Sequence, residues 1–352
     1  MPKTYTASVV GAGGGGRASM KGVSDSTRYN LHAVADLDSD VRAEIREIYP
    51  GIQTFSNHRE MFAQCPTDIV CVSTWPPSHI EVTCDALNSL SLSGMVVEKP
   101  LADNAADART ICNLIREKKL PVVVPHGLMV SEHIDCIYAH VRAGELGELR
   151  LIEIQCTNWD IINAGIHWLN FVVNLVEEPF DHVLAACDKT TRTYRDGMQV
   201  ETLSATTIQT KSGIRITMHL GDHVSVNGDG NVVFRILGSE GDIEFYGWQS
   251  AYRIRNADHP TGERIDVSTD LRTHHQRHLE NLAVQMDRDK PDYHLIENSW
   301  TALELCEAAY LSARHGCAIS LPLADFAIPD KNDWDPGMPY SGSGGGRNGR
   351  TL

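Results

Sequence analysis

Residues 5–16 read YTASVVGAGGGG, an apolar run that ends in a cluster of glycines. The run predicts a buried strand, and residues 17–28 after the glycines can form a helix. The glycines match the pattern G-x-G-x-x-G at Gly11, Gly13 and Gly16. In this pattern the first glycine permits a tight bend, the second lets a phosphate approach the backbone, and the third lets helix and strand pack closely. We therefore predict a strand–turn–helix unit that binds a dinucleotide.

A second apolar run, residues 31–35, ends at Asp36, twenty residues after Gly16. A carboxylate at this position accepts hydrogen bonds from both ribose hydroxyls of NAD and repels the 2′-phosphate of NADP. The N-terminus of the intervening helix offers free N–H groups and a partial positive charge to the pyrophosphate. We therefore expect NAD as the cofactor. The expected contacts in this part of the chain are Gly11, Gly13, Gly14, Gly15, Gly16, Arg17 and Asp36.

The composition excludes several classes of protein. The chain has 352 residues, of which 42% are hydrophobic, and its net charge is −15. This length suits two globular domains, and the negative charge argues against nucleic acid and anionic membranes as partners. Nine scattered cysteines without a C-x-x-C pair indicate reduced thiols in a cytoplasmic protein. The first strand starts too early for a signal peptide, and no apolar run has the length of a membrane span.

From residue 5 to about residue 125, apolar strands alternate with segments that have helical spacing. This alternation predicts an α/β fold, in which a parallel sheet carries helices on both faces. We expect residues 1–125 to form an NAD-binding Rossmann domain. Its strands are expected at 5–10, 31–36, 52–55, 68–74, 95–98 and 121–125, and its helices at 17–28, 40–48, 79–90 and 103–118.

After residue 125 the strands become longer and partly alternate between apolar and polar residues, which predicts an α+β domain with a large, mostly antiparallel, open-faced sheet. We expect this domain, residues 126–325, to bind substrate and to mediate oligomerisation, and its late helices can pack back on the first domain. The Gly/Pro-rich tail, 326–352, is either disordered or packed on a neighbouring subunit. Strands are expected at 148–157, 182–190, 200–210, 214–222, 232–237, 242–246 and 318–321, and helices at 131–143, 165–176, 274–288 and 297–315.

Three short motifs carry the expected chemistry. Residues 73–79 read STWPPSH and residues 98–100 read EKP, each at the end of a predicted strand. In open parallel sheets, ligands bind outside the carboxyl ends of the strands. The third motif, NAGIH at 163–167, precedes a helix in the second domain. The first two motifs add Ser73, Thr74, Trp75, Pro76, His79, Glu98 and Lys99 to the expected cofactor contacts.

Together with GSEG at 238–241 and SAR at 312–314, these motifs resemble the Gfo/Idh/MocA oxidoreductase family over about residues 5–321. The resemblance implies a Rossmann domain, an open-faced sheet domain, NAD(P), and hydride transfer at a sugar or polyol carbon. It also implies that Lys99 and His167 face the nicotinamide.

We expect Lys99, His167 and Asn163 to be catalytic. Removal of a hydride from an alcohol needs a base, and a histidine can take and return the hydroxyl proton near neutral pH. A lysine can hold the reacting oxygen. Asn163 stands where the family usually has aspartate, and an amide cannot offer His167 the charge of a carboxylate. The segment before Asn163 is also short, so we expect a substrate pocket that differs from those of relatives.

Other side chains are candidates for substrate contact. We expect His126, Trp159 and Asp160 to join Asn163 and His167 there, although His126 equally fits a structural role and Trp159 fits simple packing. Residues 274–278 read HHQRH, a spacing seen in metal sites, but no carboxylate or cysteine partner is evident. We therefore expect no metal.

The sequence thus predicts an NAD-dependent oxidoreductase that acts on a hydroxyl carbon of a sugar, polyol or glycoside, as a homodimer or homotetramer formed through the open sheet face. Two alternatives stay open. One is a redox-neutral isomerase, epimerase or glycoside-processing enzyme that keeps NAD bound. The other is a non-catalytic NAD-binding protein of the same fold.

Overall fold

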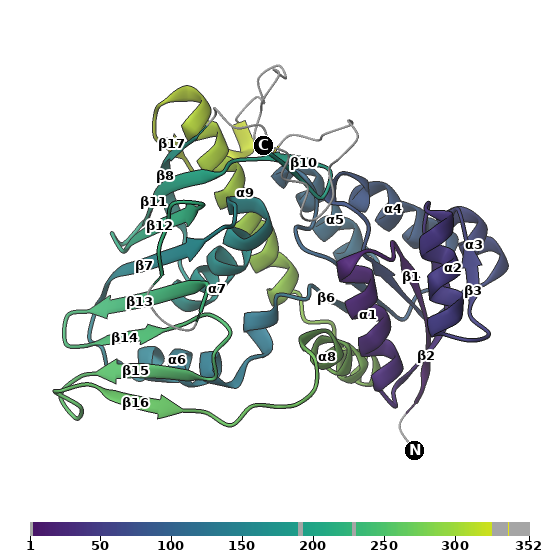
Figure 1. The fold of residues 1–352 in the computed structure, drawn as a ribbon, viewed down its shortest axis with the longest axis horizontal. Helices are drawn as coiled ribbons and strands as arrows, with labels where there is room; N and C mark the ends of the chain where they lie inside the picture. The colour runs from purple at the N-terminus through teal and green to yellow at the C-terminus, as the bar shows by residue number, and fades with distance from the viewer. Residues whose placement is uncertain (1–2, 189–192, 227–229, 326–336, 338–352) are drawn as a thin grey trace. The chain divides into compact units, whose positions relative to one another are not determined.

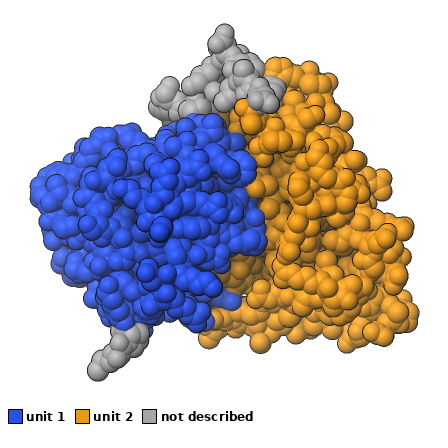
Figure 2. All heavy atoms as spheres, turned by 180° about the vertical axis from the view of Figure 1, so that it is seen from behind, with its two compact units in different colours: residues 1–125, 272–300 blue, residues 126–271, 301–352 orange. Residues whose placement is uncertain are grey.

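The computed structural model describes residues 3–188, 193–226, 230–325 and 337. These residues form two compact units (Figure 2). Unit 1 combines residues 1–125 with 272–300, and unit 2 combines residues 126–271 with 301–352. The predicted tail at 326–352 lies outside the described residues, except for Gly337.

Unit 1 contains a parallel sheet with the strand order β3-β2-β1-β4-β5-β6 (Figure 1). Connections run in opposite directions from the central pair β1 and β4, so the carboxyl ends of these two strands form the switch point at which such sheets bind ligands. The strands are β1 (Tyr5–Val10), β2 (Tyr29–Ala35), β3 (Gln53–Phe55), β4 (Ile69–Val72), β5 (Gly94–Val97) and β6 (Val122–Val123).

The helices of unit 1 differ from the predicted ones in two places. The helix expected at residues 17–28 begins at Gly14 and ends at Asp25, because the glycine turn is so tight that Gly13 already serves as its N-cap. A short helix after Asn57 was not predicted, although the Asn57 side chain accepts a hydrogen bond from the backbone N–H of Arg59 and caps it. The helices are α1 (Gly14–Asp25), α2 (Ser39–Ile48), α3 (His58–Gln64), α4 (His79–Ser89), α5 (Ala105–Glu117) and α8 (His274–Arg288).

Helix α8 comes late in the chain, yet it completes the core of unit 1. Its side chains Leu279, Leu282 and Ala283 are buried in the same cluster as Val9 and Val96 of the parallel sheet. Full burial of one leucine side chain contributes about 1.5–3 kcal/mol. The helix is therefore an integral part of the first unit.

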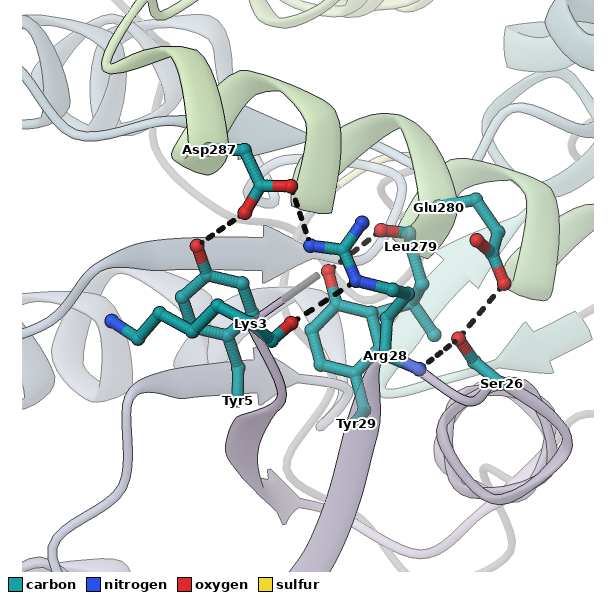
Figure 3. A network of polar contacts seen from close by, with 8 residues as sticks. All are labelled: Lys3, Tyr5, Ser26, Arg28, Tyr29, Leu279, Glu280 and Asp287. Carbon is teal, nitrogen blue, oxygen red and sulfur yellow. Dashed lines mark hydrogen bonds and ion pairs between the residues drawn. The ribbon is translucent and has the colours of Figure 1, made fainter. Parts of the chain in front are cut away.

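Polar contacts fix α8 at the amino ends of β1 and β2 (Figure 3). The Tyr29 hydroxyl donates to the carbonyl oxygen of Leu279 at 2.6 Å. The Asp287 carboxylate accepts from the Tyr5 hydroxyl at 2.9 Å and from the Arg28 guanidinium at 2.7 Å. Because these bonds join residues that are more than 240 positions apart, they set the position of α8 on the sheet.

Unit 2 contains a second sheet, with the strand order β16-β15-β14-β13-β7-β12-β11-β8-β17 among the described residues. The neighbouring strands are antiparallel except for the parallel pair β7 and β12. The hairpin β9–β10 and the strands β15 and β16 were not predicted. The strands are β7 (Leu149–Thr157), β8 (Phe180–Cys187), β9 (Thr193–Arg195), β10 (Met198–Val200), β11 (Leu203–Thr210), β12 (Arg215–Gly221), β13 (Val232–Gly238), β14 (Asp242–Phe245), β15 (Ala251–Arg255), β16 (Glu263–Asp266) and β17 (Ile319–Ser320).

One face of this sheet forms the core of unit 2. Phe171 of α7 (Ile166–Val176) lies 5.3 Å, between ring centroids, from both Phe234 and Phe245. Buried and exposed residues alternate along β11, with Ala205 and Thr207 on the exposed side. The predicted α/β Rossmann unit and the mostly antiparallel open-faced sheet are therefore confirmed. The helices here are α6 (Glu132–Arg142), α7 (Ile166–Val176) and α9 (His294–His315), of which α9 belongs to unit 1 up to Trp300.

All nine cysteines lie among the described residues, and none of them forms a disulfide bond there. Within the described part of the chain, no helix is long and apolar enough to cross a membrane.

Candidate functional site

The glycine turn between β1 and α1 has a physical reason for each glycine of its motif. Gly11 has φ +87°, and a Cβ there would lie 2.5 Å from the carbonyl oxygen of Ser73. A Cβ on Gly16 would lie 1.8 Å from the carbonyl oxygen of Gly11. A Cβ on Gly13, in contrast, would meet no described atom within 4 Å. Gly11 and Gly16 therefore permit the backbone of the turn to fold, whereas the absence of a side chain at Gly13 keeps the outer surface of the turn open.

The beginning of α1 fits a phosphate group. Its first three residues are Gly14, Gly15 and Gly16, and no described side chain caps its N-terminus. Backbone N–H groups at such an end are directed toward solvent and carry the positive end of the helix dipole. The predicted contacts Gly13 to Gly16 therefore form one surface that suits the pyrophosphate of a dinucleotide.

Asp36 follows β2 and lies against the same turn. Its Oδ2 accepts from the backbone N–H of Ala12 at 2.6 Å, and its Oδ1 accepts from the backbone N–H of Asp38 at 2.9 Å. Arg17 forms two hydrogen bonds with Glu44, at 2.7 and 2.6 Å. The Arg17 charge is thus balanced within unit 1, and this pair presents no excess positive charge to a 2′-phosphate.

His79 has a different position from the one that we expected. It is fully buried, and its two ring nitrogens lie 2.9 Å from the carbonyl oxygens of Pro100 and Thr74. Burial lowers the pKa of His79, so the ring is neutral and only one nitrogen donates. His79 therefore connects the loops that follow β4 and β5, and a direct contact with a cofactor is no longer expected.

Glu98, the first residue of the EKP motif, has a partner that the sequence did not reveal. His275 of α8 lies with its Nε2 2.6 Å from Oε1 of Glu98. Burial by itself would raise the pKa of Glu98, but His275 and Lys99 together hold it below its usual value. A Cβ on Gly15 would lie 3.0 Å from Cδ of Glu98, so the carboxylate borders the glycine turn. The expectation that the HHQRH segment lacks a carboxylate partner was wrong.

The other predicted contacts of unit 1 lie on the loop after β4. Ser73 is buried, and Thr74 accepts a hydrogen bond from the Ser78 hydroxyl at 2.8 Å. Trp75 is half-exposed, whereas the next residue, Pro76, is buried. This loop therefore presents one large aromatic surface at the carboxyl end of the parallel sheet.

In unit 2 the structure brings two of the predicted histidines together. Nδ1 of His126 lies 3.3 Å from Nδ1 of His167, and the two rings are nearly perpendicular at 84°. One of the two nitrogens must carry the hydrogen, and the other must accept it. Asn163 precedes His167 by four residues and lies in the turn that leads into the helix of His167.

A π-helical turn, Ile161–Gly165, leads into α7 and carries Asn163. Oδ1 of Asp160 accepts from the backbone N–H of Asn163 at 2.8 Å and from its side-chain amide at 2.9 Å. A carboxylate at position 163 would face Asp160 and repel it in a buried site. The amide at this position is therefore matched to the carboxylate three residues earlier.

Asp160 and Trp159, both predicted substrate contacts, pack within unit 2. Asp160 is fully buried, and its Oδ2 forms an ion pair with Arg195 at 2.7 Å. The Arg195 guanidinium also lies 4.5 Å from the ring centroid of Trp159. Both oxygens of Asp160 are thus occupied, and we now assign Asp160 to positioning of the π-helical turn.

A second buried carboxylate, Glu201, supports the same turn. It accepts from the backbone N–H of Ile161 at 2.7 Å and from the Tyr310 hydroxyl at 2.9 Å. Burial and the nearby charge of Asp160 raise its pKa from 4.5 to about 7. Asp160, Arg195, Glu201 and Tyr310, here called the buried charge network, therefore fix the segment that carries Asn163 and His167.

Sequence reasoning missed three residues of these regions: Arg195, Glu201 and Trp248, whose ring centroid lies 5.9 Å from that of His167. It also missed Glu98 as the partner of His275. Each reaches its partner from a distant segment, so local spacing could not reveal it. The one available signal was at Trp248, a tryptophan directly after a glycine in a turn.

Comparison with known proteins gives two matches to models of one oxidoreductase family. Residues 6–126 match its NAD-binding Rossmann fold, and residues 161–321 match its C-terminal alpha/beta domain. The rhizopine catabolism protein MocA of Rhizobium meliloti is 25% identical over 154 residues, which are 43% of this chain and 46% of that protein. The chain therefore matches less than half the length of this curated relative.

Two solved structures share the fold. An oxidoreductase from Agrobacterium radiobacter, in complex with NAD+, L-tartaric acid and magnesium, has a TM-score of 0.77 at 15% identity and covers 90% of this chain and 98% of its own. The myo-inositol 2-dehydrogenase from Lactobacillus plantarum has a TM-score of 0.74 at 15% identity and covers 91% of this chain and 100% of its own.

Proposed function

The chain belongs to the Gfo/Idh/MocA oxidoreductase family, and we propose that it is an NAD-dependent oxidoreductase. Its substrate would be a sugar, polyol or glycoside with a hydroxyl group at the reacting carbon. The observation that carries the proposal is the glycine turn with Asp36, where an uncapped helix N-terminus and a carboxylate lie together. The family membership and the histidine pair in unit 2 support the assignment to hydride transfer.

The preference for NAD over NADP rests on two charges. Asp36 would oppose a 2′-phosphate, and Arg17 is already paired with Glu44. Both features disfavour the additional phosphate of NADP, so we expect NAD to bind at least about tenfold more tightly, which corresponds to about 1.4 kcal/mol.

NAD, when bound, would accept or supply the hydride. The protein would supply the acid–base chemistry and hold the reacting oxygen. We propose that His167 takes the proton of the substrate hydroxyl. His126, whose Nδ1 lies 3.3 Å from Nδ1 of His167, would share a hydrogen with His167 through this contact. We propose that Lys99 donates a hydrogen bond to the reacting oxygen, and that Glu98 and His275 fix the strand end from which Lys99 extends.

Fluorescence titration with NAD and NADP tests the cofactor proposal. Asp36→Ala should narrow the difference between the two affinities. Glu44→Gln should break the ion pair with Arg17 and leave the guanidinium available to a 2′-phosphate. NADP affinity should then rise about threefold or more, the scale of one exposed charge contact, whereas the affinity for NAD should not change. Wild-type protein that binds NADP as tightly as NAD would overturn the preference.

The catalytic proposal is tested by Lys99→Ala and His167→Ala. Each should lower kcat by about 10²-fold or more, the usual scale for acid–base and electrostatic groups. The melting temperature and the affinity for NAD should change little. If His167→Ala keeps most of the activity, another base serves the reaction, and His126→Ala is the next variant to measure.

The proposal extends to the assembly and the compartment of the protein. We propose a homodimer or homotetramer that forms through the exposed face of the large sheet of unit 2, in a reducing cytoplasm that suits nine cysteines without a disulfide among the described residues.

A further inference from the structure

Trp248 lies in the turn between β14 and β15 of unit 2. Figure 1 shows these two strands side by side in the second sheet. The backbone of this turn is fixed on both sides of the tryptophan. The carbonyl oxygen of Gly247 accepts from Nε2 of the buried His133 at 3.0 Å, and the backbone N–H of Gln249 donates to the carbonyl oxygen of Tyr246 at 2.8 Å. A Cβ on Gly247 would lie 2.4 Å from the Val232 side chain, so the turn is pressed against β13.

The indole ring is held against other rings, but much of it is exposed. Its centroid lies 5.6 Å from that of Trp168 and 5.9 Å from that of His167, with the His167 ring nearly perpendicular at 79°. Even so, 48% of Trp248 is accessible to solvent. A tryptophan usually buries most of its large apolar surface, so a fixed and half-exposed ring next to a proposed catalytic base suggests a binding surface.

We propose that Trp248 is the stacking surface for the apolar C–H face of a ring-shaped substrate, a pyranoside or a cyclitol. This inference rests on the proposed function, because it assumes that His167 serves the reacting hydroxyl. The ring hydrogens of such a substrate would lie against the indole, and an equatorial hydroxyl would extend sideways toward His167. An acyclic polyol has no flat apolar face, and therefore gains little from the indole.

The chemistry of the neighbours supports a sugar rather than a purely apolar ligand. His167 contacts both His126 and Trp248, so the ring nitrogens of the two histidines lie near the indole. Ring sugars need this combination of an apolar surface and nearby hydrogen-bonding groups. Trp248 would thus determine specificity, whereas His167 would carry out proton transfer.

The test uses the full-length protein with NAD and three probes: myo-inositol, methyl β-glucopyranoside and the acyclic polyol sorbitol. Binding of each probe is measured by saturation-transfer NMR, and kcat/KM is measured wherever NADH forms. Trp248→Ala should weaken binding of the ring probes about tenfold or more, with the effect on KM rather than kcat, whereas sorbitol should change less than about twofold. Trp248→Phe should retain most of the binding, and Leu271→Ala, which changes a 99% exposed apolar residue of unit 2, should retain all of it.

Equal losses for cyclic and acyclic probes in Trp248→Ala would overturn the inference, as would a wild-type protein that binds neither ring probe. The proposed function fails in a different way. If the wild type binds a ring probe through Trp248 but reduces no NAD with any probe, the stacking surface stands and the oxidoreductase assignment falls.

Discussion

The glycine turn of unit 1 is formed by backbone groups, whereas the histidine region of unit 2, His126 and His167 with the π-helical turn before them, is formed by side chains. The turn consists of consecutive backbone groups, and its properties depend on side chains that glycine lacks. The histidine region depends on side chains that meet from distant segments, with Asp160, Arg195 and Glu201 buried beneath the π-helical turn. A site formed by backbone groups should keep its geometry when distant side chains are changed. A site supported by buried charged side chains should lose stability when one of these charges is removed.

The largest effect is expected from Arg195→Met in the buried charge network. The substitution leaves the buried carboxylate of Asp160 without its positive partner, next to the second buried carboxyl of Glu201, and breaking a buried ion pair costs about 3–5 kcal/mol. Urea unfolding at pH 8 measures this loss. Arg235→Met is the matched control, because its ion pair with Glu244 is partly exposed and should cost less than about 1 kcal/mol. If the two variants lose similar free energies of unfolding, burial does not determine the contribution of the Arg195–Asp160 ion pair.

A smaller, pH-dependent effect is expected from Glu201→Gln. Because the pKa of Glu201 is raised from 4.5 to about 7 in the folded chain, the folded state retains a proton that the unfolded state releases. Raising the pH from 5 to 8 therefore destabilises the wild type, and this contribution disappears in the glutamine variant. The variant should gain about 1–3 kcal/mol relative to wild type over this range.

In the glutamine variant Oε1 can still accept from the backbone N–H of Ile161, and the side-chain amide can donate to the Tyr310 hydroxyl oxygen in place of accepting from it, so the variant should fold. Unfolding free energies of both proteins at pH 5 and pH 8 give the comparison. A difference between the proteins that stays constant across this range would show that Glu201 does not hold the proton.

The smallest of the three effects concerns the glycine turn. In Gly13→Ala the new Cβ meets no described atom within 4 Å, so the melting temperature without cofactor should not change. The methyl group would, however, occupy the surface that the pyrophosphate must approach. The affinity for NAD should fall about tenfold, or about 1.4 kcal/mol, in a fluorescence titration. A variant with unchanged affinity would place the phosphates elsewhere.

The same difference between the two regions explains what the sequence could predict. Gly11, Gly13, Gly16 and Asp36 were found because a turn made of backbone requires particular residues at fixed spacing. The strands of unit 1 were found because burial on both faces makes them short and apolar. The roles proposed for Lys99 and His167 came from the family resemblance, because no local pattern could define them.

The ion-pair and hydrogen-bond partners in unit 2 could not be predicted, because they come from segments that are far apart in the sequence. Arg195 belongs to a three-residue strand without a clear alternation, and it pairs with Asp160 across 35 positions. Asp160 was interpreted as a substrate contact because it lies in a short loop before the helix and a carboxylate suits sugar binding, and the sequence did not reveal that Arg195 occupies it. Similarly, the His275 ring reaches Glu98 across 177 positions, so the sequence could not supply the carboxylate partner of that histidine.

Helix α8 has a consequence for the order in which the protein can fold during synthesis. Unit 1 is discontinuous, since its core needs Leu279 and Leu282, which the ribosome adds long after the six parallel strands. The early strands must wait, with part of their apolar surface uncovered, until residues 126–271 have been made. Chaperone demand should therefore be greatest during translation of the second sheet, and a fragment that stops at residue 125 should aggregate under conditions in which the full-length protein stays in solution.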